Sequence, residues 1–126
     1  MTGVQTCALP IWRLGGILEA KKLAAIAEIF NAEMAPHLYC GPVEWAANIQ
    51  LAACSPNFLI LESIEQWGGF HSKILKKPIR WEEGYVIPPT EPGLGIELNE
   101  DVALAHPYTG TQLHLEMTNR PLRKEE

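Results

Sequence analysis

The sequence predicts an α/β fold with a parallel sheet or barrel, because helical and strand-like segments alternate along its first half. Residues 17–30 have the spacing of an amphipathic helix, and residues 43–54 form a second, alanine-rich one. Two short apolar segments, residues 32–37 and 57–62, follow these helices in alternation. The four consecutive apolar residues 58–61 are typical of a strand covered on both faces, as parallel strands are.

The first helix is predicted to bury one side and to end at a polar cap. Its apolar side is predicted to contain Leu23, Ile26, Ala27 and Phe30. Asn31 follows directly, and asparagine tolerates the left-handed conformation that commonly ends a helix.

The second helix has clear signals at both ends. Pro42 suits the first helical turn, because its missing N–H would have had no partner there. The Ser55-Pro56 pair marks the end. The strand predicted before this helix, residues 32–37, ends at His37.

The alternation stops after residue 62. Residues 63–78 are polar and contain glycines, and the segment PIRWEEGYVIPP predicts a hairpin that turns at Glu83-Gly84. Residues 93–95, Gly-Leu-Gly, predict a turn, since the helix start that a phosphate-cradling loop requires does not follow. Residues 106–116 are expected to add another strand.

Composition limits the classes of protein. A chain of 126 residues, 47% hydrophobic and 20% charged, matches one water-soluble globular domain. Ten Lys and Arg against fifteen Asp and Glu give a net charge of −5, which disfavours nucleic acid or an anionic membrane as partner. Cys40 and Cys54 have neither metal-type nor redox-type spacing, so we expect a reducing, cytoplasmic setting.

The first eleven residues are interpreted as an artefact of DNA sequencing. Residues 2–11, TGVQTCALPI, are one reading frame of a common sequencing adapter, ACT GGA GTT CAG ACG TGT GCT CTT CCG ATC. Chance is a poor explanation for a match over ten successive residues. We therefore exclude residues 1–11 from fold reasoning and expect authentic protein to begin at about Arg13.

His37 and Glu62 are the candidate catalytic residues. Each ends a predicted parallel strand, and ligand sites in such folds lie at the carboxyl ends of the strands. Neighbouring strands lie roughly 4.7–4.9 Å apart, so a proton-transfer group would stand beside a carboxyl group. The alternative stays open that His37 is a hydrogen-bonded structural residue and Glu62 the first solvated position after a buried strand.

The other polar or aromatic candidates carry weaker signals. Trp67, among glycines beyond Glu62, is expected to line a substrate pocket, whereas Trp45 on the second helix is expected to pack in the core. Three histidines lack partners at metal-ligand spacing: His71, His106 and His114. Two acidic pairs are expected in solvated turns and caps rather than at a catalytic centre: Glu82-Glu83 and Glu100-Asp101.

Four blocks together resemble the last third of the enolase superfamily, mandelate racemase / muconate lactonizing enzyme group, most of all its acid-sugar (galactonate-type) dehydratases. The blocks are RLGGILEAKKLAAIAE, APHLYCGPVEWAANIQLAA, PNFLILE and PGLGIELNED, in order across residues 13–104. The resemblance implies a (β/α)7β TIM-like barrel with a capping domain to which the C-terminal segment returns. It assigns residues 12–80 to the last barrel strands and helices, and residues 81–126 to a C-terminal hairpin and tail.

The resemblance also implies strand positions. Arg13-Leu14 would be the stub of the sixth barrel strand, residues 32–37 the seventh and residues 57–62 the eighth. The family orients its histidine with an aspartate on the sixth strand, and that position is Pro10 here. A histidine without this carboxylate loses an interaction that fixes its tautomer and favours its charged form.

The chemistry implied by the resemblance is dehydration of an aldonate or aldarate to a 2-keto-3-deoxy acid. Mg²⁺, held by acidic residues of earlier strands, would stabilise the enediolate in a cytoplasmic, homo-oligomeric parent enzyme. His37 would protonate the departing hydroxyl group, and Glu62 would hydrogen-bond the substrate carboxylate. The metal ligands are expected before residue 13, so this chain is expected to bind no metal, to be inactive and to be marginally stable.

Two alternatives remain open at this level. The first is a racemase or epimerase of the same group, with His37 as one of two opposed bases. The second is a small α/β binding module without catalysis, which would unfold cooperatively by itself. The sequence leaves open which acid sugar the parent would use.

Overall fold

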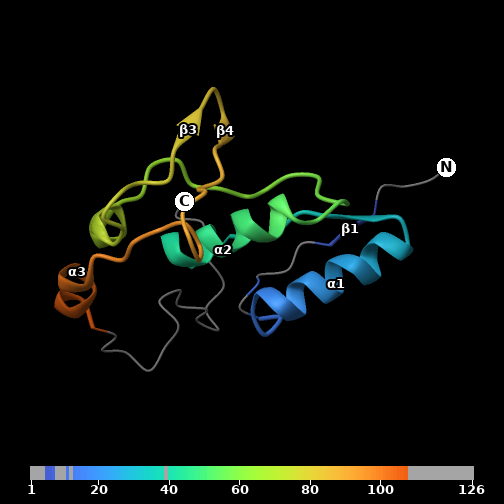
Figure 1. Ribbon diagram of the computed structural model, residues 1–126, viewed down its shortest axis with the longest axis horizontal. Coiled ribbons are helices and arrows are strands. Elements are labelled where there is room, and N and C mark those ends of the chain that lie inside the picture. Colours follow the sequence, from blue (N-terminus) through green and yellow to red (C-terminus); the bar gives the residue numbers. More distant parts are fainter. Residues whose placement is uncertain (1–4, 8–10, 12, 39, 108–126) are drawn as a thin grey trace, which may run out of the picture.

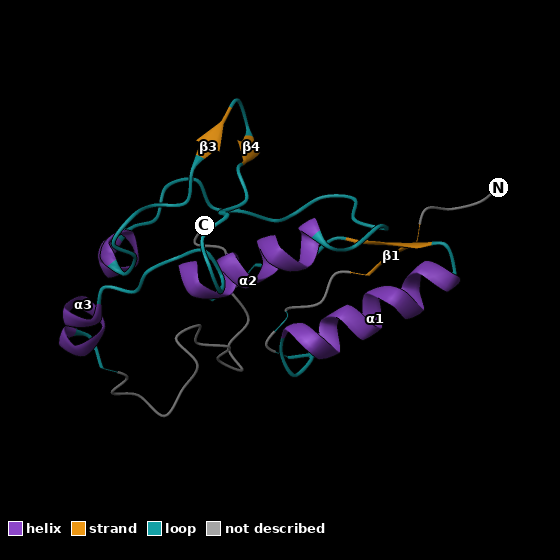
Figure 2. Cartoon of the chain, viewed as in Figure 1, coloured by secondary structure: helices purple, strands orange, loops and turns teal. Residues whose placement is uncertain are grey.

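The computed structural model describes residues 5–7, 11, 13–38 and 40–107, which form a small α/β arrangement. The helix α3 lies at one end of the molecule, α1 and β1 both lie toward the other end, and α2 lies between (Figure 1; Figure 2). The elements in chain order are β1 (Gln5–Cys7), α1 (Ile17–Ile29), β2 (Ala32–Met34), α2 (Pro42–Ala53), the 3₁₀ helix η1 (Gly69–Lys73), β3 (Trp81–Glu82), β4 (Tyr85–Val86) and α3 (Glu100–Ala105).

β2 is the centre of a short parallel layer. On one edge it pairs in parallel with all three residues of β1. On the other edge, Met34 forms a parallel bridge with Phe58. The Met34 N–H donates to the Asn57 carbonyl at 2.7 Å, and the Leu59 N–H donates to the Met34 carbonyl at 2.9 Å. The two segments expected to be neighbouring parallel strands therefore lie side by side.

The strand beside β2 is β1, so the placement of a strand at Arg13-Leu14 is wrong. Both residues lie in a turn that leads into α1. The Leu14 N–H donates to the Ile11 carbonyl at 3.2 Å, and the Gly16 N–H donates to the same carbonyl at 3.1 Å. A carbonyl that accepts from residues three and five positions later turns the chain back, which prevents an extended strand there. β1 falls within residues 1–11, whose origin in a sequencing adapter stays a prediction.

α1 confirms the predicted helix and its cap but not the predicted apolar face. Asn31 follows the helix with a φ of 54°, the left-handed conformation expected. Ala20 and Ala24 are fully buried, whereas Ile26 and Phe30 are 51% and 71% exposed. Small side chains one turn apart let α1 approach its neighbours closely, since little bulk separates the backbones. The larger side chains therefore point outward.

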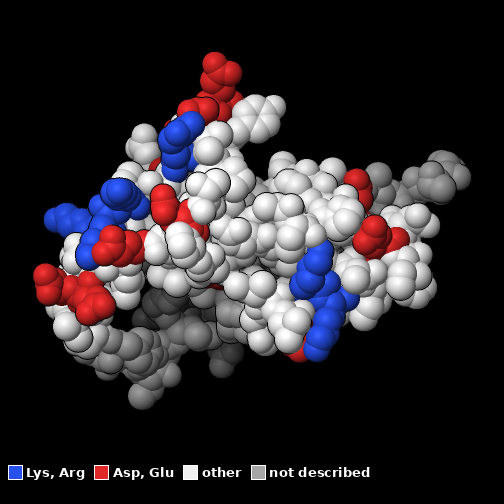
Figure 3. Space-filling view, viewed as in Figure 1, with Lys and Arg blue, Asp and Glu red and all other residues white. Residues whose placement is uncertain are grey.

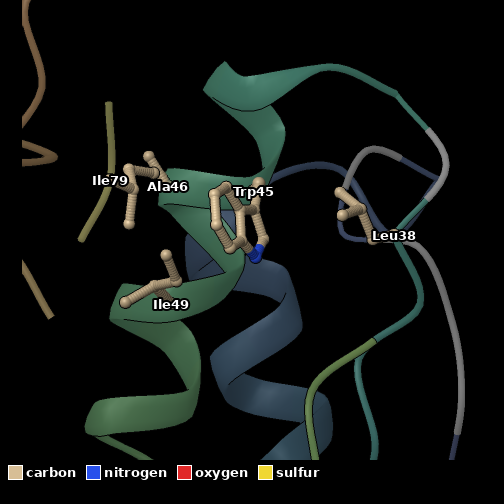
Figure 4. Packing of buried hydrophobic residues seen from close by; sticks show 5 residues of the cluster. All are labelled: Leu38, Trp45, Ala46, Ile49 and Ile79. Carbon is tan, nitrogen blue, oxygen red and sulfur yellow. The ribbon is translucent and has the colours of Figure 1, made fainter. Parts of the chain in front are cut away.

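α2 supplies most of the core and begins at Pro42, as predicted. Its side chains pack with residues before and after it in one cluster, drawn in Figure 4: Leu38, Trp45, Ala46, Ile49 and Ile79. Trp45 is 2% exposed, and burying an indole of this size contributes about 4–6 kcal/mol as an upper bound. Its Nε1–H donates to the Ser63 hydroxyl at 3.0 Å, so the polar end of the ring is satisfied.

The expectation that residues 58–61 are buried on both faces is wrong. Phe58, Leu59 and Ile60 are 38%, 47% and 62% exposed. The segment is hydrogen-bonded to β2 along one edge, and its apolar side chains border an open depression shared with α2 and the hairpin. A run of apolar residues indicates that a strand can be buried, but other segments have to supply the layers that cover it.

The hairpin is confirmed, with its turn at the expected residues. β3 and β4 pair antiparallel, Trp81 opposite Val86. Glu83 and Gly84 have φ values of 50° and 84°, as a two-residue turn of the mirror-image type requires. In Figure 3, charged side chains lie around the hairpin and α3 and again over α1, while the middle of the visible face is largely uncharged.

The segment after the hairpin forms turns and then a short helix. Gly93 and Gly95 both have a φ of 72°, which confirms a turn rather than a phosphate-cradling loop. Glu100 and Asp101 lie in the first turn of α3, where negative charge favours the helix dipole. Most of the strand predicted over residues 106–116 falls outside the described residues.

Candidate functional site

The site is built where β2 and the neighbouring parallel segment end. His37 lies three residues beyond β2, and Glu62 ends the segment that begins at Asn57. The Glu62 N–H donates to the Pro36 carbonyl at 3.3 Å, which continues the pairing that starts at Met34. Because both chains run in the same direction, both side chains emerge at the same rim.

His37 and Glu62 are in direct contact. Nδ1 of His37 hydrogen-bonds to Oε2 of Glu62, and the Leu38 N–H donates to the same oxygen at 3.0 Å. The two side chains are 39% and 53% exposed, so the pair is accessible to a small molecule. The bond to the carboxylate fixes the orientation of the ring; when Nδ1 donates to Glu62, Nε2 carries a proton only in the charged, imidazolium form.

A third group holds the main chain of His37. The Nδ2 amide of Asn48, on α2, donates to the His37 carbonyl at 3.3 Å. Asn48 is fully buried, and no described residue donates to its Oδ1. Sequence reasoning did not single out this residue. The available signal was an amide within the apolar stretch WAANIQLAA, where a buried polar group needs a reason.

The pair opens onto a shallow depression of about 280 Å³. Its lining comes from the two strand ends: Ala35, Pro36, His37, Ile60, Leu61 and Glu62. A larger depression of about 600 Å³ lies between residues 58–61 and the hairpin. Glu83 is the acidic residue among its otherwise apolar or hydroxyl-bearing lining, so it offers little for proton transfer. The smaller depression is therefore the better candidate for chemistry.

Trp67 is not among the residues that line the depression beside His37 and Glu62. Its ring lies 6.1 Å from that of Trp45 and 5.8 Å from that of His71, measured between centroids. These contacts place it against the core, and its role in binding substrate stays a prediction.

The remaining polar candidates lie apart from the pair. His106 stacks on Phe70 with 4.9 Å between centroids, and its Nδ1 hydrogen-bonds to the Val102 carbonyl at 2.9 Å. His114 lies outside the described residues. Glu82 pairs with Arg80 in the hairpin at 2.6 Å, as a solvated acidic residue does.

Cys40, three residues beyond His37, is held as a neutral thiol. Burial raises the pKa of Cys40 to about 11, and a hydrogen bond to Glu44 and the negative charge of Glu44 act in the same direction. The thiolate is the nucleophilic form, so this thiol is a poor nucleophile near neutral pH. Cys54 is an exposed free cysteine.

The described residues do not fit the Mg²⁺ site that the resemblance implies. Within residues 5–7, 11, 13–38 and 40–107, no group of three or more His, Cys, Asp or Glu side chains could hold a metal ion. The one carboxylate at the site, Glu62, already accepts from a ring and a backbone N–H. Mg²⁺ requires oxygen ligands in octahedral geometry, which this pair does not supply.

Comparisons with known proteins agree with the resemblance. D-gluconate dehydratase from Thermoproteus tenax is 36% identical over 90 residues, or 71% of this chain. D-gluconate/D-galactonate dehydratase from Picrophilus torridus is 39% identical over 97 residues, or 77% of this chain. The chain spans only 18% and 25% of the lengths of these two relatives. No described helix is both long and apolar enough to pass through a bilayer.

Solved structures show the same relationship. The mandelate racemase/muconate lactonizing enzyme from Sulfitobacter sp. has a TM-score of 0.80 and 54% identity, covering 92% of this chain and 29% of that one. The enzyme-like protein of the same description from Roseovarius sp. TM1035 has a TM-score of 0.73 and 59% identity, covering 85% and 26%. The family model described as Enolase C-terminal domain-like matches residues 2–102, and the chain belongs to this family, which has a TIM-barrel-type domain.

Proposed function

We propose that this chain is the C-terminal part of a Mg²⁺-dependent acid-sugar dehydratase. The printed names of its relatives, D-gluconate and D-galactonate dehydratases, support this reaction class. In this proposal β2 with residues 35–37 corresponds to the seventh barrel strand and residues 57–62 to the eighth. Residues 12–80 belong to the barrel, and residues 81–126 complete the barrel and the capping region.

The reaction removes water from an aldonate or aldarate. The α proton of the substrate leaves, an enediolate forms, and the β hydroxyl departs as water to give an enol that becomes the 2-keto-3-deoxy acid. Departure of a hydroxide is unfavourable unless it is protonated, so a general acid is needed at that oxygen. His37 takes this role as an imidazolium, with Nδ1 donating to Glu62 and Nε2 carrying the proton that is transferred.

Glu62 takes two roles in the proposal. It orients the ring of His37. In the family, an aspartate on the sixth strand has this orienting role. Glu62 also hydrogen-bonds the substrate carboxylate, for which its carboxyl group must carry a proton. The contact between His37 and Glu62 is the single observation that carries the proposal.

The 126-residue chain is proposed to be inactive by itself. The described residues supply a general acid and a carboxyl group, but not the metal ligands or the base that the reaction also requires. A metal ion contributes several kcal/mol of charge stabilisation at the enediolate, and this pair cannot replace it. The test therefore uses the chain extended by its upstream coding sequence, beside the 126-residue chain.

The decisive variant is His37→Asn, with His106→Asn as its matched control. Both remove one partly exposed imidazole, but His106 lies on the α3 end with no contact to Glu62 among its described contacts. Loss of a general acid lowers the rate by about 10²–10⁴-fold, and the control retains the activity. Formation of 2-keto-3-deoxy acids is measured over a panel of aldonates and aldarates. Full activity of His37→Asn refutes the assignment.

A racemase or epimerase is the second candidate, because the similar solved structures are described as mandelate racemase/muconate lactonizing enzymes. Both reactions begin with exchange of the α proton. Deuterium incorporation at the α carbon without loss of water would favour this candidate over the dehydratase.

A further inference from the structure

The peptide group between His37 and Leu38 is held at both of its polar ends. Its carbonyl oxygen accepts from Nδ2 of Asn48 at 3.3 Å, and its N–H donates to Oε2 of Glu62 at 3.0 Å. These two partners come from different elements, α2 and the end of the parallel segment. A peptide plane fixed at both ends cannot rotate without breaking one bond, so its orientation is set by Asn48 and Glu62 together.

Asn48 is an unusual residue for its place. It is 0% exposed and lies on α2 between the buried residues Ala47 and Ile49. Its Oδ1 has no donor among the described residues, so its amide works at this site through Nδ2 alone. A buried acceptor without a partner destabilises the fold. The contribution of Asn48 is therefore better sought in the orientation of His37 than in global stability.

We propose that Asn48 is a positioning residue for His37, and the proposal rests on the proposed catalytic role of His37. The same carboxylate oxygen binds the Leu38 N–H and Nδ1 of His37, so one atom fixes the position of both the peptide and the ring. When Asn48 no longer holds the carbonyl, the peptide rotates and its N–H loses its fixed direction toward Glu62. The ring then loses its fixed alignment with Glu62 and so its fixed tautomer.

The test is nuclear magnetic resonance on the whole 126-residue chain, with ¹³C-carbonyl histidine and ¹⁵N-leucine. Only two His–Leu peptides occur in the sequence, His37-Leu38 and His114-Leu115. The labelling therefore selects the amide signals of Leu38 and Leu115, and the Leu115 signal is an internal reference. The Leu38 signal is identified by its displacement in Glu62→Gln. In Asn48→Leu this signal moves most of the way to its Glu62→Gln position. The His37 ring nitrogens change from one tautomer to a mixture.

Asn57→Leu is the matched control. Asn57 also carries a buried Oδ1 without a described partner, and its Nδ2 donates to the carbonyls of Ala24 and Ala32. This variant removes amide bonds of the same kind without touching the peptide beyond His37. It leaves the Leu38 signal and the His37 tautomer in place.

An unmoved Leu38 signal in folded Asn48→Leu, or equal movement in Asn57→Leu, overturns the proposal. If Asn48→Leu does not fold, Asn48→Ala is used, since alanine adds no bulk and favours a helix. It is judged by the same two signals against Asn57→Ala. No substrate takes part in these measurements, so the proposed function can fail in the activity assay while this inference holds, and the reverse.

Discussion

Replacing Glu62 by glutamine tests whether one carboxylate oxygen holds both the ring of His37 and the backbone of Leu38. The side chains of His37 and Glu62 are 39% and 53% exposed, so their contact contributes about 0.2–1 kcal/mol. A backbone N–H bonded to a charged acceptor contributes about 1.5–3 kcal/mol, and the glutamine carbonyl keeps a neutral bond worth about 1 kcal/mol. The expected loss in the free energy of unfolding is therefore about 1–2 kcal/mol, since solvent weakens both interactions.

Urea unfolding followed by circular dichroism measures this loss. With a dependence of about 1–3 kcal/mol per molar urea, the midpoint of Glu62→Gln falls by roughly 1 M. The matched control is Glu97→Gln, because Glu97 is 67% exposed and its side chain pairs only with Lys76 among the described contacts. We expect no measurable change in that variant, as for most exposed pairs.

High salt separates the two parts of the effect. At 1 M salt the screening length is about 3 Å, so the loss from an exposed ion pair disappears while the loss at the Leu38 N–H remains. Equal midpoints for the Glu62 and Glu97 variants would refute the shared-oxygen geometry. A loss in Glu62→Gln that vanishes in 1 M salt would do the same.

Two further predictions concern Cys40 and Gly95. The folded chain holds the Cys40 proton up to a pKa of about 11 against 9.0 for the ordinary thiol, so stability falls as pH rises from 9 to 11. At pH 8 iodoacetamide should label exposed Cys54 before Cys40, and equal rates would contradict this. Gly95→Ala places a Cβ 2.5 Å from that of Pro89, whereas Gly93→Ala, also at φ 72°, meets nothing within 4 Å. Gly95→Ala should therefore lose about 1–3 kcal/mol more on urea unfolding, and equal losses would exclude the clash.

Features that depend on a few neighbouring residues were predicted from the sequence. Pro42 begins α2, and Asn31 takes the left-handed conformation after α1. The hairpin turns at Glu83-Gly84 because two residues with positive φ are what such a turn needs. The two turns depend on which residues tolerate a positive φ, and the start of α2 depends on the missing N–H of proline. Residue type indicates both properties.

Features that depend on what lies across space were not predicted. The apolar period of α1 indicated Ile26 and Phe30 as buried, but the helix packs through Ala20 and Ala24 instead. A period shows that a helix has a face, while the choice among adjacent faces is made by the surface it meets. The site partner Asn48 was missed for the same reason, because its bond to the carbonyl of His37 is not visible in residue spacing.

The contact between His37 and Glu62 does not require a closed barrel. It is set by the register of two parallel segments, through backbone bonds that begin at Met34 and end with the Glu62 N–H on the Pro36 carbonyl. A shift of one residue would turn Glu62 to the opposite face, so this register is a necessary condition for the pair. The register holds although the neighbouring Ile60 is 62% exposed. The orientation of the His37 ring against Glu62 is therefore already present among the described residues.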